Sequence, residues 1–294
     1  YRLQVSGPDG AAVWDTGRVG SGQAAFVTYR GPALASRTRY TWTVTAWDNH
    51  GGTAAAASWF ETALAPADWQ ATWMRTPRAY TQRHKGFGTQ PPATLFRRAF
   101  TLQTAPQTAR LYLTCLGVYR LTVNGQRPDD REFAPEHTSY RRTLCYQTYD
   151  VTGLLRAGEN VLGIEVGDGW YCCPQTQPPI DGLQPDHTLL FQLEVTGADG
   201  RRRVVASDER LRCSEGEVRA SDLFDGEAQD WNQARPGWDA PGFDAAGWAQ
   251  PVAVPAPLPA EALCPEVGGP VRPVRLLPAV KVYRSPKNEW IVDF

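Results

Sequence analysis

Several features are scarce in this sequence, and each scarcity excludes a class of protein. Its 294 residues contain one methionine and no apolar run long enough to span a bilayer, so no membrane helix is expected. Basic and acidic residues number 30 and 31, with no basic face to attract nucleic acid or an anionic membrane. The six cysteines include no C-x-x-C pair, so no zinc site is indicated. What remains is an ordinary globular chain of about two domains.

The cysteine pattern does not resemble a disulfide framework and therefore leaves the compartment open to secreted, periplasmic and cytoplasmic locations alike. Cys172 and Cys173 are adjacent and poorly placed to pair with each other. Cys115 falls inside an expected strand, where it is predicted to act as a small buried hydrophobe. The chain starts inside a strand-like run, so we expect any targeting segment to have been removed or to lie outside this sequence.

What the sequence does contain is period-two alternation, together with 11 Trp, 11 Tyr and 24 Pro. Ala109, Leu111, Leu113 and Cys115, for example, alternate with Arg, Tyr and Thr, as a half-buried strand requires. A later run, residues 160–167 (NVLGIEVG), is mostly apolar and predicts a strand buried on both faces. Useful helical periodicity is almost absent. The pattern predicts an all-β chain.

Composition divides this all-β chain into four parts. Residues 1–64 resemble a fibronectin type III domain without its first strand, because an aromatic-rich strand precedes a Gly turn and a closing strand. Residues 65–92 form a connector, predicted to lie on the surface. Residues 93–256 hold many strands with long excursions, which suggests a jelly-roll β-sandwich. Residues 257–294 are expected to be a linker and the first strands of a further β-domain.

Five segments, in their order and spacing, resemble the N-terminal region of glycoside hydrolase family 78, the bacterial α-L-rhamnosidases. The resemblance covers most of the chain, although each segment alone is a weak signal. The segments are FETALAPADWQATW, ARLYLTCLGVYRLTVNG, CYQTYDVTGLLRAGENVLGIEVGDGWY, LFDGEAQDWNQARPGWDAPGFDAAGW and WIVDF.

The resemblance implies a modular enzyme that cleaves terminal α-L-rhamnose with inversion. Its jelly roll is similar to a rhamnose-binding carbohydrate module, and its catalytic acids stand on an (α/α)6 barrel. Inversion needs two carboxyl groups about 6.5–9.5 Å apart. This chain has no helical repeat to mount them, so we assign no catalytic residue. Its expected partners are rhamnose-containing glycosides or polysaccharides and the catalytic domain of the same protein.

The sequence departs from the family pattern at two places. Many relatives have Pro-Gly-Trp-Thr-Asp-Tyr where this chain has residues 135–140, PEHTSY, and Tyr-Asp-Ala-Arg where it has residues 228–232, AQDWN. Family sugar contacts are therefore not carried over to either stretch.

One candidate sugar site is Asp168, Trp170 and Tyr171 in the segment GDGWYCC. A tryptophan beside a carboxylate can stack on a pyranose ring while the carboxylate accepts two hydroxyl hydrogen bonds. The alternative is structural: Gly167 and Gly169 permit a bulge, and Trp170 closes the end of the sandwich.

A second candidate is the acidic run Asp225, Glu227 and Asp230, which could hold Ca²⁺ with Trp231 and Asn232 as sugar contacts. The resemblance supports this hypothesis, since related modules include some that bind rhamnose through calcium. No EF-hand pattern is present, and the alternative is an acidic loop that satisfies turn and backbone hydrogen bonds. His137 and His187 stand alone in sequence and are expected to be surface or packed residues.

Two functions of different classes are open at this point. The chain is either part of a rhamnosidase, in which it positions the catalytic barrel and contacts sugar, or a stand-alone carbohydrate-binding or adhesion module. The closing run WIVDF reads as an unfinished strand, which favours the first.

Overall fold

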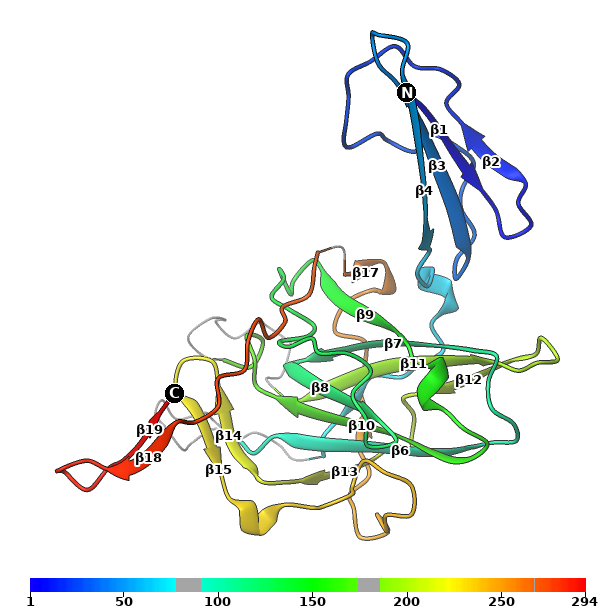
Figure 1. Cartoon of the computed structure of the whole chain (residues 1–294). Coiled ribbons are helices and arrows are strands. Elements are labelled where there is room, and N and C mark those ends of the chain that lie inside the picture. Colours follow the sequence, from blue (N-terminus) through cyan, green and yellow to red (C-terminus); the bar gives the residue numbers. More distant parts are fainter. Residues whose placement is uncertain (78–90, 174–185, 267) are drawn as a thin grey trace. The chain divides into compact units, whose positions relative to one another are not determined.

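The computed structural model describes residues 1–77, 91–173, 186–266 and 268–294 (Figure 1). In these ranges the regular structure consists of β-strands and short 3-10 turns, without an α-helix. The predicted all-β class is therefore confirmed. Two compact units divide the chain, Tyr1–Trp69 and Gln70–Phe294. None of the described segments forms a helix long and apolar enough to cross a membrane.

The first unit is a single antiparallel sheet in the order β2-β1-β3-β4. Its long central hairpin pairs every residue from Arg39 opposite Glu61 to Trp47 opposite Thr53, as the alternating run predicted. Asp48 closes the hairpin by accepting hydrogen bonds from the backbone N–H groups of His50 and Gly52. The strands are β1 (Arg2–Ser6), β2 (Ala12–Asp15), β3 (Arg39–Trp47) and β4 (Thr53–Glu61).

The second unit is built from a four-stranded sheet, β13-β6-β10-β8, and a seven-stranded one, β16-β5-β11-β7-β9-β17 with β12 on β11. All pairs are antiparallel except β17 with β9. The strands of the four-stranded sheet are β6 (Thr94–Leu102), β8 (Val118–Val123), β10 (Gly158–Gly167) and β13 (Arg212–Glu215). Those of the other are β5 (Met74–Arg75), β7 (Thr108–Leu116), β9 (Leu144–Asp150), β11 (Thr188–Thr196), β12 (Arg202–Ala206), β16 (Val252–Ala253) and β17 (Leu263–Pro265).

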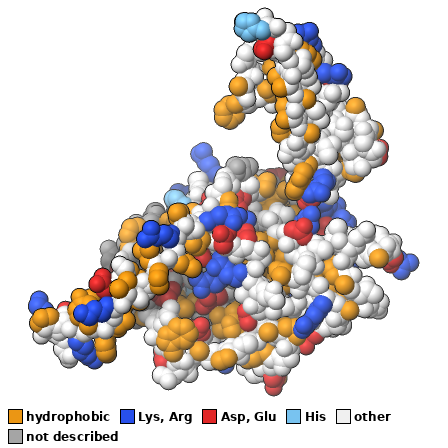
Figure 2. All heavy atoms as spheres, viewed as in Figure 1, with side chains coloured by type: hydrophobic (Ala, Val, Ile, Leu, Met, Phe, Trp, Pro, Cys, Tyr) orange, Lys and Arg blue, Asp and Glu red, His pale blue; other side chains and the backbone are white. Residues whose placement is uncertain are grey.

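The core of this unit joins side chains of both sheets in one apolar cluster. Phe96, Leu162 and Ile164 come from the four-stranded sheet, and Leu113 and Phe191 from the seven-stranded one, all fully buried. Cys115 lies in the same cluster, as its strand position predicted. Two small hairpins complete the unit, β14 (Val218–Asp222) with β15 (Gly226–Gln229) and β18 (Lys281–Arg284) with β19 (Trp290–Asp293). Acidic and basic side chains are interspersed over the face drawn in Figure 2, without a region of one sign.

One expectation about the connector is wrong. Residues 65–92 were predicted to lie on the surface, yet Trp73, Met74 and Thr76 are buried and β5 pairs with both β11 and β16. An apolar Trp-Met pair removes more area from water inside the sandwich than at its surface, which outweighs the polar composition nearby. Residues 78–90 of the connector lie outside the described part.

The Asn124–Gly125 pair makes the tight turn that its sequence predicts, with positive φ angles of 52° and 79°. The returning chain, however, forms only isolated bridges with β8, at Gln126 and Ala134, instead of a full strand. The ladder partner of β8 is β10. Asn124 instead ties the turn to β10, because its side-chain oxygen accepts the backbone N–H of Val161 at 2.8 Å.

Candidate functional site

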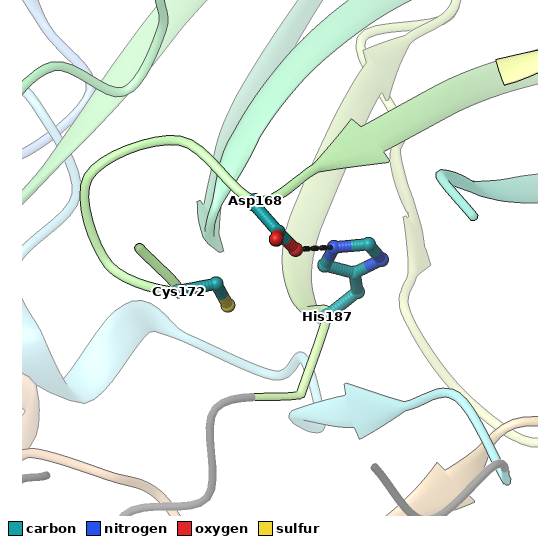
Figure 3. A group of neighbouring side chains, drawn as sticks. All are labelled: Asp168, Cys172 and His187. Atoms are coloured by element: carbon teal, nitrogen blue, oxygen red, sulfur yellow. Dashed lines mark hydrogen bonds and ion pairs between the residues drawn. The ribbon is translucent and has the colours of Figure 1, made fainter. Parts of the chain in front are cut away.

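The candidate site begins at the turn that follows β10. Asp168 is fully buried there, and its Oδ1 accepts the Nε2–H of His187 at 3.0 Å (Figure 3). The other ring nitrogen of His187 lies 2.9 Å from the hydroxyl of Thr94. Asp168 directly follows β10, and Thr94 is the first residue of β6, so both belong to the four-stranded sheet. His187 directly precedes β11 of the seven-stranded sheet. The imidazole therefore ties the two sheets together at one end of the unit.

This geometry gives the Asp168 carboxylate a structural task. It points inward to His187, and the carbonyl of the same residue accepts the backbone N–H of Cys172 at 3.1 Å, which closes the turn. A fully buried carboxylate cannot share a sugar ring with a surface tryptophan without leaving its imidazole partner. The sugar-binding role of Asp168 stays a prediction, and this arrangement does not favour it.

Asp168, Cys172 and His187 also form the one group of metal-type ligands found in the described ranges. Their donor atoms lie within 4.8 Å of one another, and a carboxylate, a thiolate and an imidazole suit a divalent transition metal. Both imidazole nitrogens already have partners, however, and an ion would have to displace the bond between His187 and Asp168. We therefore interpret the group as a hydrogen-bonded tie between sheets.

Trp170 is half-buried and lies in the same turn. It belongs to a group of five neighbouring rings that we call the aromatic cluster: Phe133, His137, Tyr140, Trp170 and Tyr171. Its ring centroid lies 5.9 Å from that of Phe133 and 6.0 Å from that of His137. Phe133 is 45% exposed and His137 is also exposed, so these three rings offer an aromatic surface to solvent. Tyr171, the third predicted sugar contact here, is buried and packs edge-on against Tyr140 at 5.2 Å.

The loop that carries Phe133 and His137 has an unusual backbone. Phe133 and Glu136 have positive φ angles, and the Ala134–Pro135 peptide bond between them is cis. This loop contains residues 135–140, where the sequence departs from the family pattern. His137 takes the position of the motif's tryptophan and stands against Trp170.

The second predicted group is spread along the β14–β15 hairpin. Asp225 lies in its turn, while Glu227 stands opposite Ser221 in the ladder. Asp230 follows β15 and caps a short 3-10 turn, Trp231–Gln233, by accepting the backbone and side-chain N–H groups of Asn232. The described part of the chain does not gather these three carboxylates at one point. The calcium site therefore stays a prediction, and Asp230 behaves as the alternative interpretation expected.

The remaining two predicted sugar contacts have different environments. Trp231 is 70% exposed, so its ring is accessible to a ligand. The side chain of Asn232 donates to Asp230 at 2.9 Å and shares in the cap. A sugar stacked on Trp231 would therefore compete with Asp230 for the side-chain N–H group of Asn232.

Glu165 shows how the acidic hairpin acts on its surroundings. Burial raises the pKa of its carboxyl above the ordinary 4.5, Arg120 opposite it lowers the pKa, and Glu217 and Glu227 raise it further. The folded chain thus binds this proton more tightly than the unfolded chain does. Stability from this group is complete below the ordinary Glu value and falls as the pH rises through the raised folded value.

We therefore expect Glu165→Gln to stabilise the chain at neutral pH, because the neutral amide has no charge to desolvate. Thermal unfolding at pH 7 should give a midpoint a few degrees above that of the parent, and the gain should vanish near pH 4. Glu261→Gln, on an exposed turn, is the control and should change neither value. A lower midpoint for Glu165→Gln at pH 7 would contradict the interpretation.

Sequence reasoning missed two features of this site. His187 stands 19 residues from Asp168, and no local pattern links them. Phe133 and His137 were not chosen as contacts for Trp170, although the altered motif at residues 135–140 marked their loop as a place to look.

These observations place the chain in the class of modular all-β proteins. Residues 1–66 match a family described as the Rha78A-like, N-terminal immunoglobulin domain. Residues 104–275, more than half of the chain, match one described as the alpha-L-rhamnosidase N-terminal domain. The chain belongs to this family of α-L-rhamnosidase N-terminal domains, which confirms the resemblance that its sequence carries.

Individual relatives agree with this assignment. An α-L-rhamnosidase of Formosa agariphila is 31% identical over 262 residues, which is 82% of this chain and 27% of that protein. The crystal structure of a native α-L-rhamnosidase from Aspergillus terreus superposes with a TM-score of 0.81 at 29% identity, over 99% of this chain and 34% of that one. A Streptomyces avermitilis α-L-rhamnosidase complexed with L-rhamnose shares the fold, with a TM-score of 0.85 at 23% identity, over 99% and 45% of the two chains.

Proposed function

We propose that this chain is the non-catalytic N-terminal part of an α-L-rhamnosidase whose complete protein hydrolyses terminal α-L-rhamnose. In that protein it positions a catalytic domain and contacts rhamnose-containing glycosides or polysaccharides. The family match over residues 104–275 carries the proposal. The chain spans about a third of the curated relatives it matches, 27% and 33% of two of them, and its described residues hold no helix for a catalytic barrel.

The proposed domain plan follows the sequence divisions. Residues 1–64 are the fibronectin type III-like unit, residues 65–92 the connector, residues 93–256 the jelly roll, and residues 257–294 the linker and the start of a further β-domain. Two observations support it: the first compact unit ends at Trp69, and the strands of the two large sheets fall almost wholly within 93–256.

The first expected result is that the purified chain releases no rhamnose from an aryl α-L-rhamnoside. Inverting hydrolysis needs an acid and a base on opposite sides of the scissile bond. The resemblance places both on a helical barrel, and the described part of this chain contains no α-helix. A full-length rhamnosidase assayed in parallel shows that the substrate is competent. Rhamnose release that persists after further purification would refute the non-catalytic assignment.

We further propose that the half-buried ring of Trp170 and the exposed rings of Phe133 and His137 form the sugar-contacting surface. Ring faces stack on the apolar face of a pyranose, and two rings about 6 Å apart present a surface of that size. A partly exposed platform of rings binds a single sugar weakly. We expect L-rhamnose to bind with a Kd near 1 mM, which corresponds to about −4 kcal/mol.

Titration of the chain with L-rhamnose, with and without Ca²⁺, tests this surface. Trp170→Ala should weaken binding at least tenfold, whereas Trp231→Ala and Trp59→Ala, the latter in the first unit, should not. Loss of binding in Trp231→Ala, or a requirement for Ca²⁺, would instead favour the acidic hairpin as the site. The absence of heat or of chemical-shift change at high sugar concentration in the parent would end the sugar-binding proposal.

The alternative function is a stand-alone carbohydrate-binding or adhesion module. The reading frame downstream of Phe294 separates the two. Helical repeats with acidic motifs support the rhamnosidase, and a stop codon supports the module.

A further inference from the structure

Two thiols meet where the chain leaves the second unit's main sheets. The short strand β17 runs parallel to β9, and its register places Cys264 directly opposite Cys145. The two Sγ atoms are 3.6 Å apart, which is van der Waals contact between unbonded sulfurs. Both side chains are partly buried, and both cysteines are free thiols.

We propose that Cys145 and Cys264 are a redox modification site, at which a disulfide-class oxidant such as oxidised glutathione converts the two thiols into a disulfide. Paired residues of neighbouring strands have Cα atoms about 4.8 Å apart, inside the range of about 4.4–6.8 Å that disulfides span. Their side chains leave the sheet on the same face. The bond therefore needs rotation about the Cβ–Sγ axes and little backbone movement.

The reaction balances through a mixed disulfide. One protein thiolate attacks the oxidant and releases one glutathione thiolate; the second protein thiolate then attacks the mixed disulfide and releases the protein-bound glutathione. The chain loses two protons and two electrons, and the oxidant becomes two thiols. A dithiol reductant reverses the process.

The surroundings of Cys145 make the reaction slow at neutral pH. Burial, the neighbouring Cys264, and the carboxylates Glu136 and Glu266 raise the pKa of Cys145 to about 12, so almost none of it is thiolate at neutral pH. The Cys145 thiol is therefore a weak nucleophile at neutral pH. Formation should be slow at neutral pH and faster in alkaline buffer.

The remaining cysteines do not compete in the folded chain. Cys115, Cys172, Cys173 and Cys213 are all buried, with 2% or less of each residue exposed. A large oxidant cannot reach a buried thiol without unfolding the chain. Oxidation of the native protein should thus be confined to one pair.

The disulfide would link β17 covalently to β9, where the two strands are now held together by non-covalent contacts. β17 has only three residues, and the segment after it is tied back by Glu266, which pairs with Arg131 at 2.5 Å, and by a bridge between Glu132 and Val271. Oxidation would fix this crossing segment to β9 and close a loop between residues 119 positions apart. Closing so long a loop restricts the unfolded chain and raises thermal stability.

Incubating the native chain in oxidised glutathione, followed by alkylation and peptide mapping under non-reducing conditions, tests the site. We expect the count of titratable thiols to fall from six to four, with one cross-linked peptide containing Cys145 and Cys264. The unfolding midpoint should rise by about 5 °C and return on reduction. Cys264→Ser and Cys145→Ser should each abolish the cross-link and the shift.

Peptide mapping of the parent chain does not depend on either variant folding. Six free thiols after prolonged oxidation of the folded protein would overturn the proposal. So would a disulfide that joins any other pair, or glutathione that stays attached to Cys264 without transfer to Cys145.

Discussion

Replacing Asp168 with alanine should lower the free energy of unfolding by about 3–5 kcal/mol, because it removes one member of a buried hydrogen-bonded pair and leaves the other without its acceptor. Asp168 and His187 are both fully buried, 3.0 Å apart. The Nε2–H of the buried imidazole would then lose its carboxylate acceptor. Because the same imidazole contacts Thr94 of the other sheet, we expect cooperative loss of structure at this end of the unit.

Urea unfolding of three variants separates the hydrogen bond from the charge. Asp168→Asn keeps an oxygen that can accept the Nε2–H and should cost clearly less than alanine. His187→Ala should cost a similar amount to Asp168→Ala, and the double variant should cost much less than the sum of the two, because the residues act as one unit. Additive effects of the two single variants would contradict a direct partnership. Glu261→Ala, on an exposed turn, controls for loss of a carboxylate charge alone.

The parts of the fold that could be predicted from the sequence are those encoded by local alternation. The run from Ala109 to Cys115 became β7, and the mostly apolar run at residues 160–167 became β10, which lies between β6 and β8 and is largely buried on both faces. Local alternation locates each strand, although Tyr112 and Thr114, on the face of β7 expected to be exposed, are buried as well.

The parts that could not be predicted depend on residues far apart in sequence. Trp73 and Met74 were placed on the surface because their neighbours are polar, yet β5 finds partners in β11 and β16, more than 100 residues away. His187 was likewise expected to be an isolated residue, because its partners Thr94 and Asp168 are far from it in the sequence. Local sequence records which residue types are present but not which distant backbone they will meet.

Gly117 makes the same point at the base of the candidate site, where it separates β7 from β8. Its φ is 144°, a conformation that residues with a side chain rarely adopt, and a Cβ atom there would lie 2.4 Å from the carbonyl oxygen of Gly167. That oxygen belongs to the end of β10, one residue before Asp168, so it cannot move without disturbing the buried pair.

Gly117→Ala is therefore expected to cost about 3 kcal/mol or more, the sum of backbone strain and of overpacking against a fixed carbonyl. Gly153→Ala is the matched control, since a Cβ there meets nothing within 4 Å, and it should change stability by less than about 0.5 kcal/mol. Denaturant unfolding measures both. Equal stabilities for the two variants would show that the backbone of β10 at Gly167 can move to accommodate the added Cβ atom. If the clash is accommodated by a shift of the turn instead, Trp170 should move with it, and the fluorescence of the aromatic cluster and the affinity for L-rhamnose should change together.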